Sequence, residues 1–102
     1  MDILARIKRC ALLRRVRFTY KATDERVRDD LTELDILESL VNATEIKKKI
    51  RSTTRLRRGQ IEYLYIILAP TVQGEVVYTK GKLVDESGVE TYYLLVSAKV
   101  AI

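Results

Sequence analysis

The spacing of the apolar residues changes at about residue 44, and this change constrains the fold more than any other feature of the sequence. Before it, apolar side chains recur every three or four residues, the period of a helix that is buried on one side. After it, β-branched and aromatic residues dominate, which is typical of strands. With 102 residues, this order predicts one α+β domain: N-terminal helices packed on one face of a mainly antiparallel sheet, as a two-layer sandwich.

Three helices and one short strand are expected in the first half. The apolar spacing predicts an amphipathic helix over residues 2 to about 15, with Cys10 on its buried face as a packing residue. The alternation at 16–19 indicates a short extended segment. A second helix is predicted over 23–31, with Asp24 and Glu25 in its first turn. Thr32 and Asp35 have the spacing of a capping box, so a third helix begins there and ends near residues 42–44.

The second half is predicted to form the sheet. Residues 46–54 fit either a strand or an irregular basic arm, and their spacing does not decide between the two. Gly59 marks a turn, and 61–68 is apolar on both faces, which predicts a central, fully covered strand that ends at Pro70. A turn at Gln73 and Gly74 then precedes strands at 76–83 and 90–99, joined by a hairpin loop at 85–88.

The residues that are missing exclude several kinds of site. The chain has no histidine, which excludes a Ser/His/Asp or Cys/His nucleophile, a histidine acid or base and a His-ligated metal. With a single cysteine it forms neither an internal disulfide nor a zinc ribbon. No apolar run reaches the roughly 18 residues that span a bilayer, and the N-terminus does not resemble a secretory signal. We therefore expect a cytoplasmic protein without membrane, metal or cofactor.

Positive charge is concentrated in two blocks, although the net charge of the chain is only +5. Residues 44–58 alone carry seven basic and one acidic side chain. Such a block suits a polyanion, because each phosphate that it neutralises releases counterions. The alternatives are a solvated face or a surface matched to an acidic protein. The residues predicted to bind RNA in this block are Lys47, Lys48, Lys49, Arg51, Arg55, Arg57 and Arg58.

A row of polar residues in the strand at 76–83 is the best candidate for chemistry. Tyr78, Lys80 and Lys82 alternate, so their side chains share one face of the strand, and Lys99 lies near the end of the partner strand. Tyrosine and lysine can support RNA cleavage by 2′-hydroxyl attack without a metal, through positioning and electrostatics. The alternative is the ordinary solvated face of an antiparallel sheet.

Two segments of the last third resemble MqsR-type toxins and the related RelE-like group. These are QGEVVYTK at 73–80 and LVSAK at 95–99. The resemblance implies a RelE-like fold and a bacterial mRNA endoribonuclease of a type II toxin-antitoxin system that needs no metal. It matches Tyr78 and Lys99 to the catalytic tyrosine and C-terminal lysine, and Lys80 to a neighbouring basic residue. The family's middle lysine falls on any of residues 47–49, and its catalytic glutamine has no counterpart.

The functional hypothesis is therefore an RNA-cleaving toxin with Tyr78, Lys80 and Lys99 as catalytic residues, and with the basic block and Lys82 holding flanking phosphates. Its partners would be RNA and a cognate antitoxin, acidic or zinc-containing, that covers the same surface. The alternative is a noncatalytic basic α+β module that binds nucleic acid or an acidic protein. The sequence predicts no oligomeric state.

Overall fold

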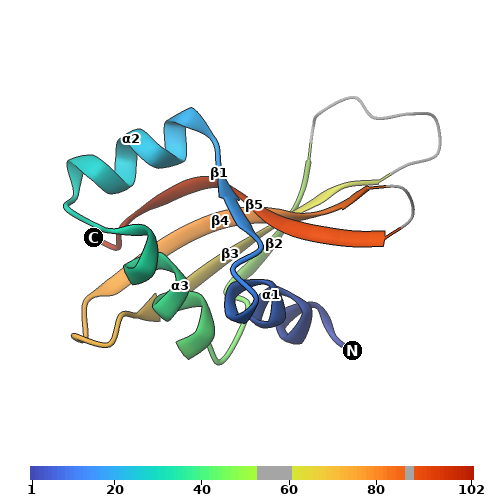
Figure 1. The fold of residues 1–102 in the computed structure, drawn as a ribbon, viewed down its shortest axis with the longest axis horizontal. Coiled ribbons are helices and arrows are strands. Elements are labelled where there is room, and N and C mark those ends of the chain that lie inside the picture. Colours follow the sequence, from blue (N-terminus) through green and yellow to red (C-terminus); the bar gives the residue numbers. More distant parts are fainter. Residues whose placement is uncertain (53–60, 87–88) are drawn as a thin grey trace.

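The computed structural model describes residues 1–52, 61–86 and 89–102. Its elements are α1 (Ile3–Leu12), β1 (Val16–Phe18), α2 (Tyr20–Arg28), α3 (Glu33–Asn42), β2 (Lys48–Arg51), β3 (Tyr63–Pro70), β4 (Val76–Glu86) and β5 (Val89–Val100). The strands form one sheet in the order β1-β5-β4-β3-β2 (Figure 1). Strand β1 is parallel to β5 and the other neighbouring pairs are antiparallel. The predicted α+β class is confirmed, with a sheet that is mixed because of β1.

Helices α1 and α3 pack on the same face of the sheet, which we call the inner face; the opposite one is the outer face. Cys10 is 3% exposed and lies among the core residues, as predicted. The Ser39 hydroxyl of α3 donates a 2.8 Å hydrogen bond to the Ala69 carbonyl of β3, which satisfies a buried polar group at the helix–sheet contact. The largest buried apolar side chains come from both layers: Ile7, Ile36, Leu40, Ile67, Val77, Tyr93 and Leu95.

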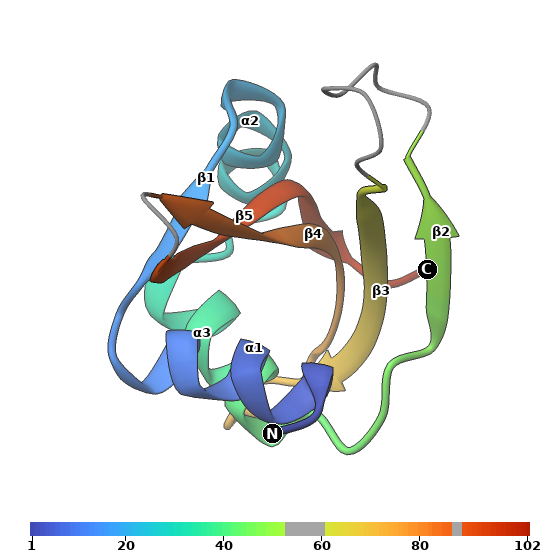
Figure 2. The ribbon, with the colours of Figure 1, turned by 90° about the vertical axis from the view of Figure 1, so that its right-hand side faces the viewer.

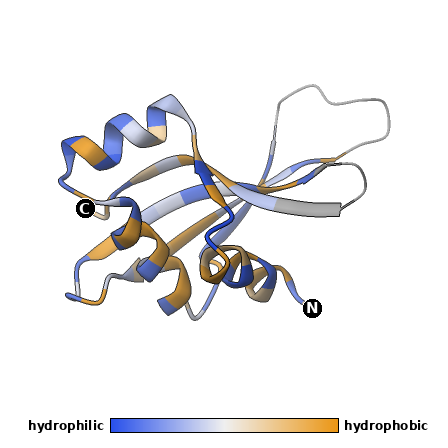
Figure 3. Cartoon of the chain, viewed as in Figure 1, coloured by the Kyte–Doolittle hydropathy of each residue, from blue (hydrophilic) through white to orange (hydrophobic). Residues whose placement is uncertain are grey.

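Helix α2 departs from the prediction in both its start and its place. The Thr19 side chain accepts a hydrogen bond from the Ala22 amide, so the helix begins at Tyr20, and Asp24 and Glu25 lie beyond its first turn. It runs beside the part of β5 that lies beyond the pairing with β1, on the other side of that strand from α1 and α3 (Figure 2). The prediction that all helices share one face is therefore wrong for α2. The reason is its composition: α2 is largely hydrophilic (Figure 3), and Ala22 is its one buried residue.

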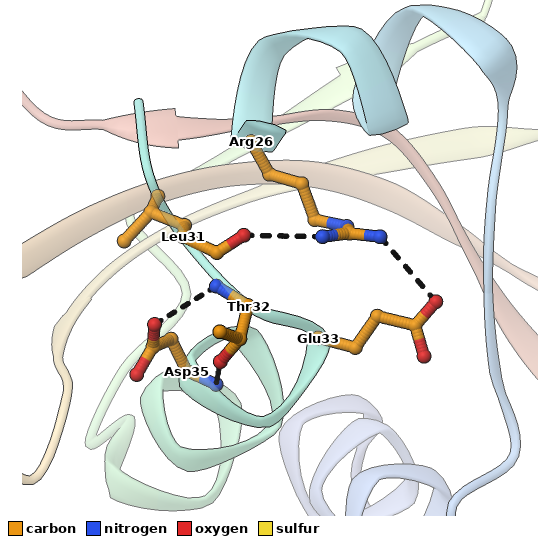
Figure 4. A network of polar contacts seen from close by, with 5 residues as sticks. All are labelled: Arg26, Leu31, Thr32, Glu33 and Asp35. Atoms are coloured by element: carbon orange, nitrogen blue, oxygen red, sulfur yellow. Dashed lines mark hydrogen bonds and ion pairs between the residues drawn. The ribbon is translucent and has the colours of Figure 1, made fainter. Parts of the chain in front are cut away.

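The turn between α2 and α3 is fixed by polar contacts (Figure 4). The Thr32 hydroxyl accepts a 3.0 Å hydrogen bond from the Asp35 amide, and the Asp35 carboxylate accepts a 2.9 Å bond from the Thr32 amide. This confirms the predicted capping box. Arg26 of α2 donates a 3.1 Å hydrogen bond to the Leu31 carbonyl and lies 3.5 Å from a Glu33 carboxylate oxygen. Together these contacts set where α3 begins.

Strand β3 is central, between β2 and β4, but one of its faces is not covered as predicted. Its inner-face residues Tyr65, Ile67 and Ala69 are buried, whereas on the outer face Leu68 is 40% exposed. Helix α3 packs against β3 from the inner side, so the outer side chains lack an equivalent cover. Residues 46–54 fit either a strand or a basic arm, and their described part contains a short strand at Lys48–Arg51 that pairs with β3. Residues 53 and 54 lie outside the described residues.

The turn at Gly74 is confirmed, and its φ of 90° is a conformation that glycine adopts without strain. Strands β4 and β5 are longer than predicted, because Asp85 and Glu86 pair with Glu90 and Val89 and belong to the ladder rather than to the loop. Predicted features at Gly59, Ser87 and Gly88 lie outside the described residues. No helix in the described part of the chain is long and apolar enough to cross a membrane.

Candidate functional site

The predicted polar row lies on the outer face of β4. Lys80 is opposite Ser97, and Tyr78 is opposite Lys99, in the register of β4 and β5. The residues on either side of Tyr78 along the strand, Val77 and Thr79, are fully buried on the inner face. The strict alternation along β4 therefore places Tyr78, Lys80 and Lys82 on one surface, as expected from their spacing.

Lys99 reaches the same surface because of an irregularity in β5. The pairing shifts by one residue between Lys80 and Gly81, since Lys80 pairs with Ser97 but Gly81 pairs with Leu95. A one-residue shift moves a side chain to the opposite face of a sheet. Without this bulge, continuation of the Gly81–Leu95 register would place Lys99 on the inner face. With it, the Lys99 ammonium lies 5.3 Å from the centre of the Tyr78 ring.

Tyr78 and Lys99 line a cavity of about 540 Å³. Leu68 and Val100 give it apolar walls, Tyr78 contributes a phenol, and Lys99 contributes a cation. The Asp29 carboxylate also borders it but accepts a 2.8 Å hydrogen bond from the Val100 amide, so that oxygen is engaged in holding α2 to β5. An anionic ligand with an apolar part suits this lining, because it would meet apolar walls and a positive charge at once.

Glu25 of α2 adds a carboxylate to the site, beyond the residues predicted from the sequence. Its Oε1 accepts a 2.7 Å hydrogen bond from the Ser97 hydroxyl and a 3.2 Å bond from the Ala98 amide. Burial raises the pKa of Glu25, but these bonds and the positive charges of Lys21 and Lys99 outweigh it and lower the pKa below its ordinary value of 4.5. A negative charge thus persists beside Lys99. No local motif signals it, because helix and strand meet only in the tertiary structure.

Lys82 differs from its neighbours in the row. Its ammonium lies 3.0 Å from a carboxylate oxygen of Glu62, and both side chains are largely buried. Lys82 is therefore already neutralised in part, and a phosphate would have to compete with Glu62 for it. Among the described residues, Lys80 has no ion pair of this kind, and Lys99 is exposed. The structure brings Lys82 to the predicted surface but gives it a partner there.

The basic block is divided between the two faces. In β2, Lys48 pairs with Ile66, whose other neighbour is Lys80, so Lys48 shares the outer face with the candidate site. Lys49 alternates to the inner side, where its ammonium lies 4.0 Å from the Tyr63 ring centre. Lys47 and Arg51 are exposed near the ends of β2, away from the β4–β5 pair. The remaining predicted residues, Arg55, Arg57 and Arg58, lie outside the described residues.

One further cation–aromatic pair lies on the outer face. The Arg17 guanidinium of β1 lies 4.0 Å from the centre of the Tyr92 ring of β5. Tyr93 is completely buried, so only Tyr92 of the two neighbouring tyrosines lies on the outer face. No local pattern indicates a role for Arg17, because its proximity to Tyr92 depends on the parallel pairing of β1 with β5.

In the described part of the chain, no three His, Cys, Asp or Glu residues are grouped as a metal site. Comparisons with protein-family models, with curated proteins and with solved structures find no match to this chain.

Proposed function

We propose that this protein binds RNA on the outer face of its sheet and cleaves it at Tyr78, Lys80 and Lys99. The observation that carries the proposal is the direct pairing of Tyr78 with Lys99 across β4 and β5, at the wall of the 540 Å³ cavity. A phenol and an ammonium beside one cavity provide a proton-transfer group and a charge for a phosphodiester. Lys80 lies two residues from Tyr78 on the same face and adds a second positive charge.

The reaction consumes no water and requires no cofactor. The RNA 2′-oxygen loses its proton and attacks the adjacent phosphorus, the bond from phosphorus to the 5′-oxygen breaks, and that oxygen takes up a proton. The products are a 2′,3′-cyclic phosphate and a 5′-hydroxyl end. Tyr78 accepts the proton of the 2′-oxygen or donates one to the 5′-oxygen, and solvent water carries out the other proton transfer. The ammonium groups of Lys80 and Lys99 neutralise the charge that develops on the phosphoryl oxygens.

The proposal includes the regulation and location expected of a toxin in a bacterial toxin-antitoxin pair, following a RelE-like plan. An acidic or zinc-containing antitoxin would cover the basic outer face and so block RNA, and both proteins would act in the cytoplasm. The net charge of +5 supports an acidic partner.

The second candidate is a noncatalytic basic module that binds nucleic acid or an acidic protein. It is favoured by the division of the basic block, because Lys49 faces Tyr63 on the inner side, away from Tyr78. Cations directed to both sides of β2 suit a partner that wraps around this edge of the sheet.

The two candidates are separated by incubating the purified protein with mixed-sequence RNA in the presence of a chelator. Wild type is compared with Tyr78→Phe and Lys99→Ala, and Tyr20→Phe is the matched control because Tyr20 is 93% exposed on α2. We expect cleavage by wild type and the control, and a reduction of about 100-fold or more in both site variants. Equal cleavage by all four proteins would reveal a contaminating nuclease. Salt-sensitive binding without cleavage would support the noncatalytic module.

A further inference from the structure

The Arg17–Tyr92 pair has the form of a platform for a nucleobase. The guanidinium lies 4.0 Å from the Tyr92 ring centre, and Arg17 is exposed while Tyr92 is half-buried. A guanidinium that covers a ring on one side can take a base on its other side, because both groups are planar and the cation favours π-systems. This pair lies outside the residues to which the proposed cleavage assigns a role.

The Arg17–Tyr92 pair and Tyr78 lie at different points along the outer face of the sheet. Tyr92 is opposite Val84 in the β4–β5 ladder, and Val84 follows Tyr78 by six residues on the same face of β4. At the rise of an extended strand, the two tyrosines are therefore about 20 Å apart. Lys80 and Lys82 lie between them, about 7 Å from each other along β4. That interval is similar to the spacing of successive phosphates in an extended single strand.

From this arrangement we infer that the outer face binds an extended single strand of RNA along β4, with one base stacked on the Arg17–Tyr92 pair and another in the cavity beside Tyr78. The RNA backbone follows Lys80 and Lys82 between the two bases. A duplex does not satisfy this arrangement, because its bases are already stacked on each other and cannot reach the two platforms. The inference rests on the RNA-binding part of the proposed function and not on cleavage.

Length dependence tests the inference most directly. A trinucleotide with one base in the cavity beside Tyr78 is too short to reach the Arg17–Tyr92 pair about 20 Å away, whereas an octanucleotide reaches both. We would measure affinity by fluorescence anisotropy with 2′-O-methyl RNA, which has no free 2′-hydroxyl to attack. The variants are Tyr92→Leu, which removes the ring, and Arg17→Lys, which keeps the charge but removes the planar group. Tyr20→Leu is the matched control on the exposed surface of α2.

We expect Tyr92→Leu and Arg17→Lys to weaken octanucleotide binding at least about fivefold, which corresponds to the loss of one base stack. Trinucleotide binding and the control should not change. An octanucleotide with abasic sites should bind equally to wild type and Tyr92→Leu, and a duplex of the same length should bind more weakly than the single strand. Thermal unfolding of each variant checks that the sheet is intact, and Arg17→Lys covers the case in which Tyr92→Leu unfolds.

The outcomes separate this inference from the proposed function. If the protein binds no RNA of either length, both are wrong. If it binds RNA but Arg17→Lys and Tyr92→Leu affect both lengths equally, or neither, the platform is wrong while RNA binding stands. Salt-sensitive binding that is indifferent to abasic sites would indicate a phosphate-binding surface and would also overturn the platform.

Discussion

Glu25 and Ser97 are 72 residues apart in the sequence and share a 2.7 Å hydrogen bond, with the Ser97 hydroxyl as donor. The same carboxylate oxygen accepts a bond from the Ala98 amide, and one helical turn later Asp29 accepts a bond from the Val100 amide. Helix α2 therefore supplies acceptors to amides of β5 that no strand pairs. Because β1 pairs with β5 only as far as Leu95, the rest of that side of β5 would expose free amides, and the helix covers it instead.

The first prediction concerns Glu25 and pH. Its pKa is lowered in the folded protein, so the stability it provides is fully present above its ordinary pKa of 4.5 and is lost as the pH falls through the lowered value. We expect Glu25→Gln to reduce the free energy of unfolding by about 1–3 kcal/mol near neutral pH, because hydrogen bonds to a charged acceptor are lost. Urea unfolding at neutral pH and at about pH 3 measures this.

At acidic pH, the difference in free energy of unfolding between wild type and Glu25→Gln should become smaller, because protonation removes the charge from the wild-type side chain. Glu33→Gln is the control, since Glu33 is exposed and makes one 3.5 Å contact with Arg26. A difference that stays constant across this pH range would show that the charge of Glu25 does not contribute.

The second prediction concerns Gly81, where β4 passes close to β5. A Cβ at this position would lie 2.7 Å from the Leu94 carbonyl oxygen and within 2.9 Å of two atoms of the Tyr93 ring. The ring is fully buried and the oxygen is part of the backbone, so neither can move aside freely. We expect Gly81→Ala to lower the free energy of unfolding by about 1–3 kcal/mol.

Denaturant unfolding of Gly74→Ala provides the comparison. A Cβ at Gly74 meets nothing within 4 Å, so only the positive φ should destabilise Gly74→Ala. We expect its free energy of unfolding to fall by about 1–2 kcal/mol. If Gly81→Ala has the same free energy of unfolding as wild type, β4 and β5 can move apart at this point without loss of stability.

The third prediction concerns Glu62, which competes with phosphate for Lys82 through their 3.0 Å ion pair. On the proposed RNA-binding surface, Glu62→Gln should raise affinity for single-stranded RNA several-fold. It should also steepen the dependence of log affinity on log salt by about 1, because one more cation becomes available to a phosphate. Titrations at several salt concentrations measure both quantities.

Glu45→Gln is the matched control for this experiment, because it changes the net charge equally at an exposed residue before β2. If both variants raise affinity by the same factor, the effect comes from overall charge. If Lys82→Gln leaves the salt dependence unchanged, Lys82 does not contact RNA.

Local sequence patterns predict an element correctly where its structure depends only on its own residues. The capping box at Thr32 and Asp35 and the apolar stripe containing Cys10 are confirmed, because capping and helical amphipathicity are short-range properties. The start of α2 differs from the prediction because Thr19 continues the alternating strand pattern of the sequence, whereas in the structure its hydroxyl caps the helix. The outer face of β3 was misjudged because an apolar sequence does not reveal whether another element covers it.

For the candidate site, the sequence by itself determined that Tyr78, Lys80 and Lys82 share a face, because side chains along a strand alternate with a period of two. Only the tertiary structure decided that Lys99 joins them. That depends on a bulge in β5, and a bulge results from how two strands and the layers around them pack rather than from either strand's pattern. The places of Glu25, Glu62 and Arg17 were likewise decided by contacts between elements distant in the chain.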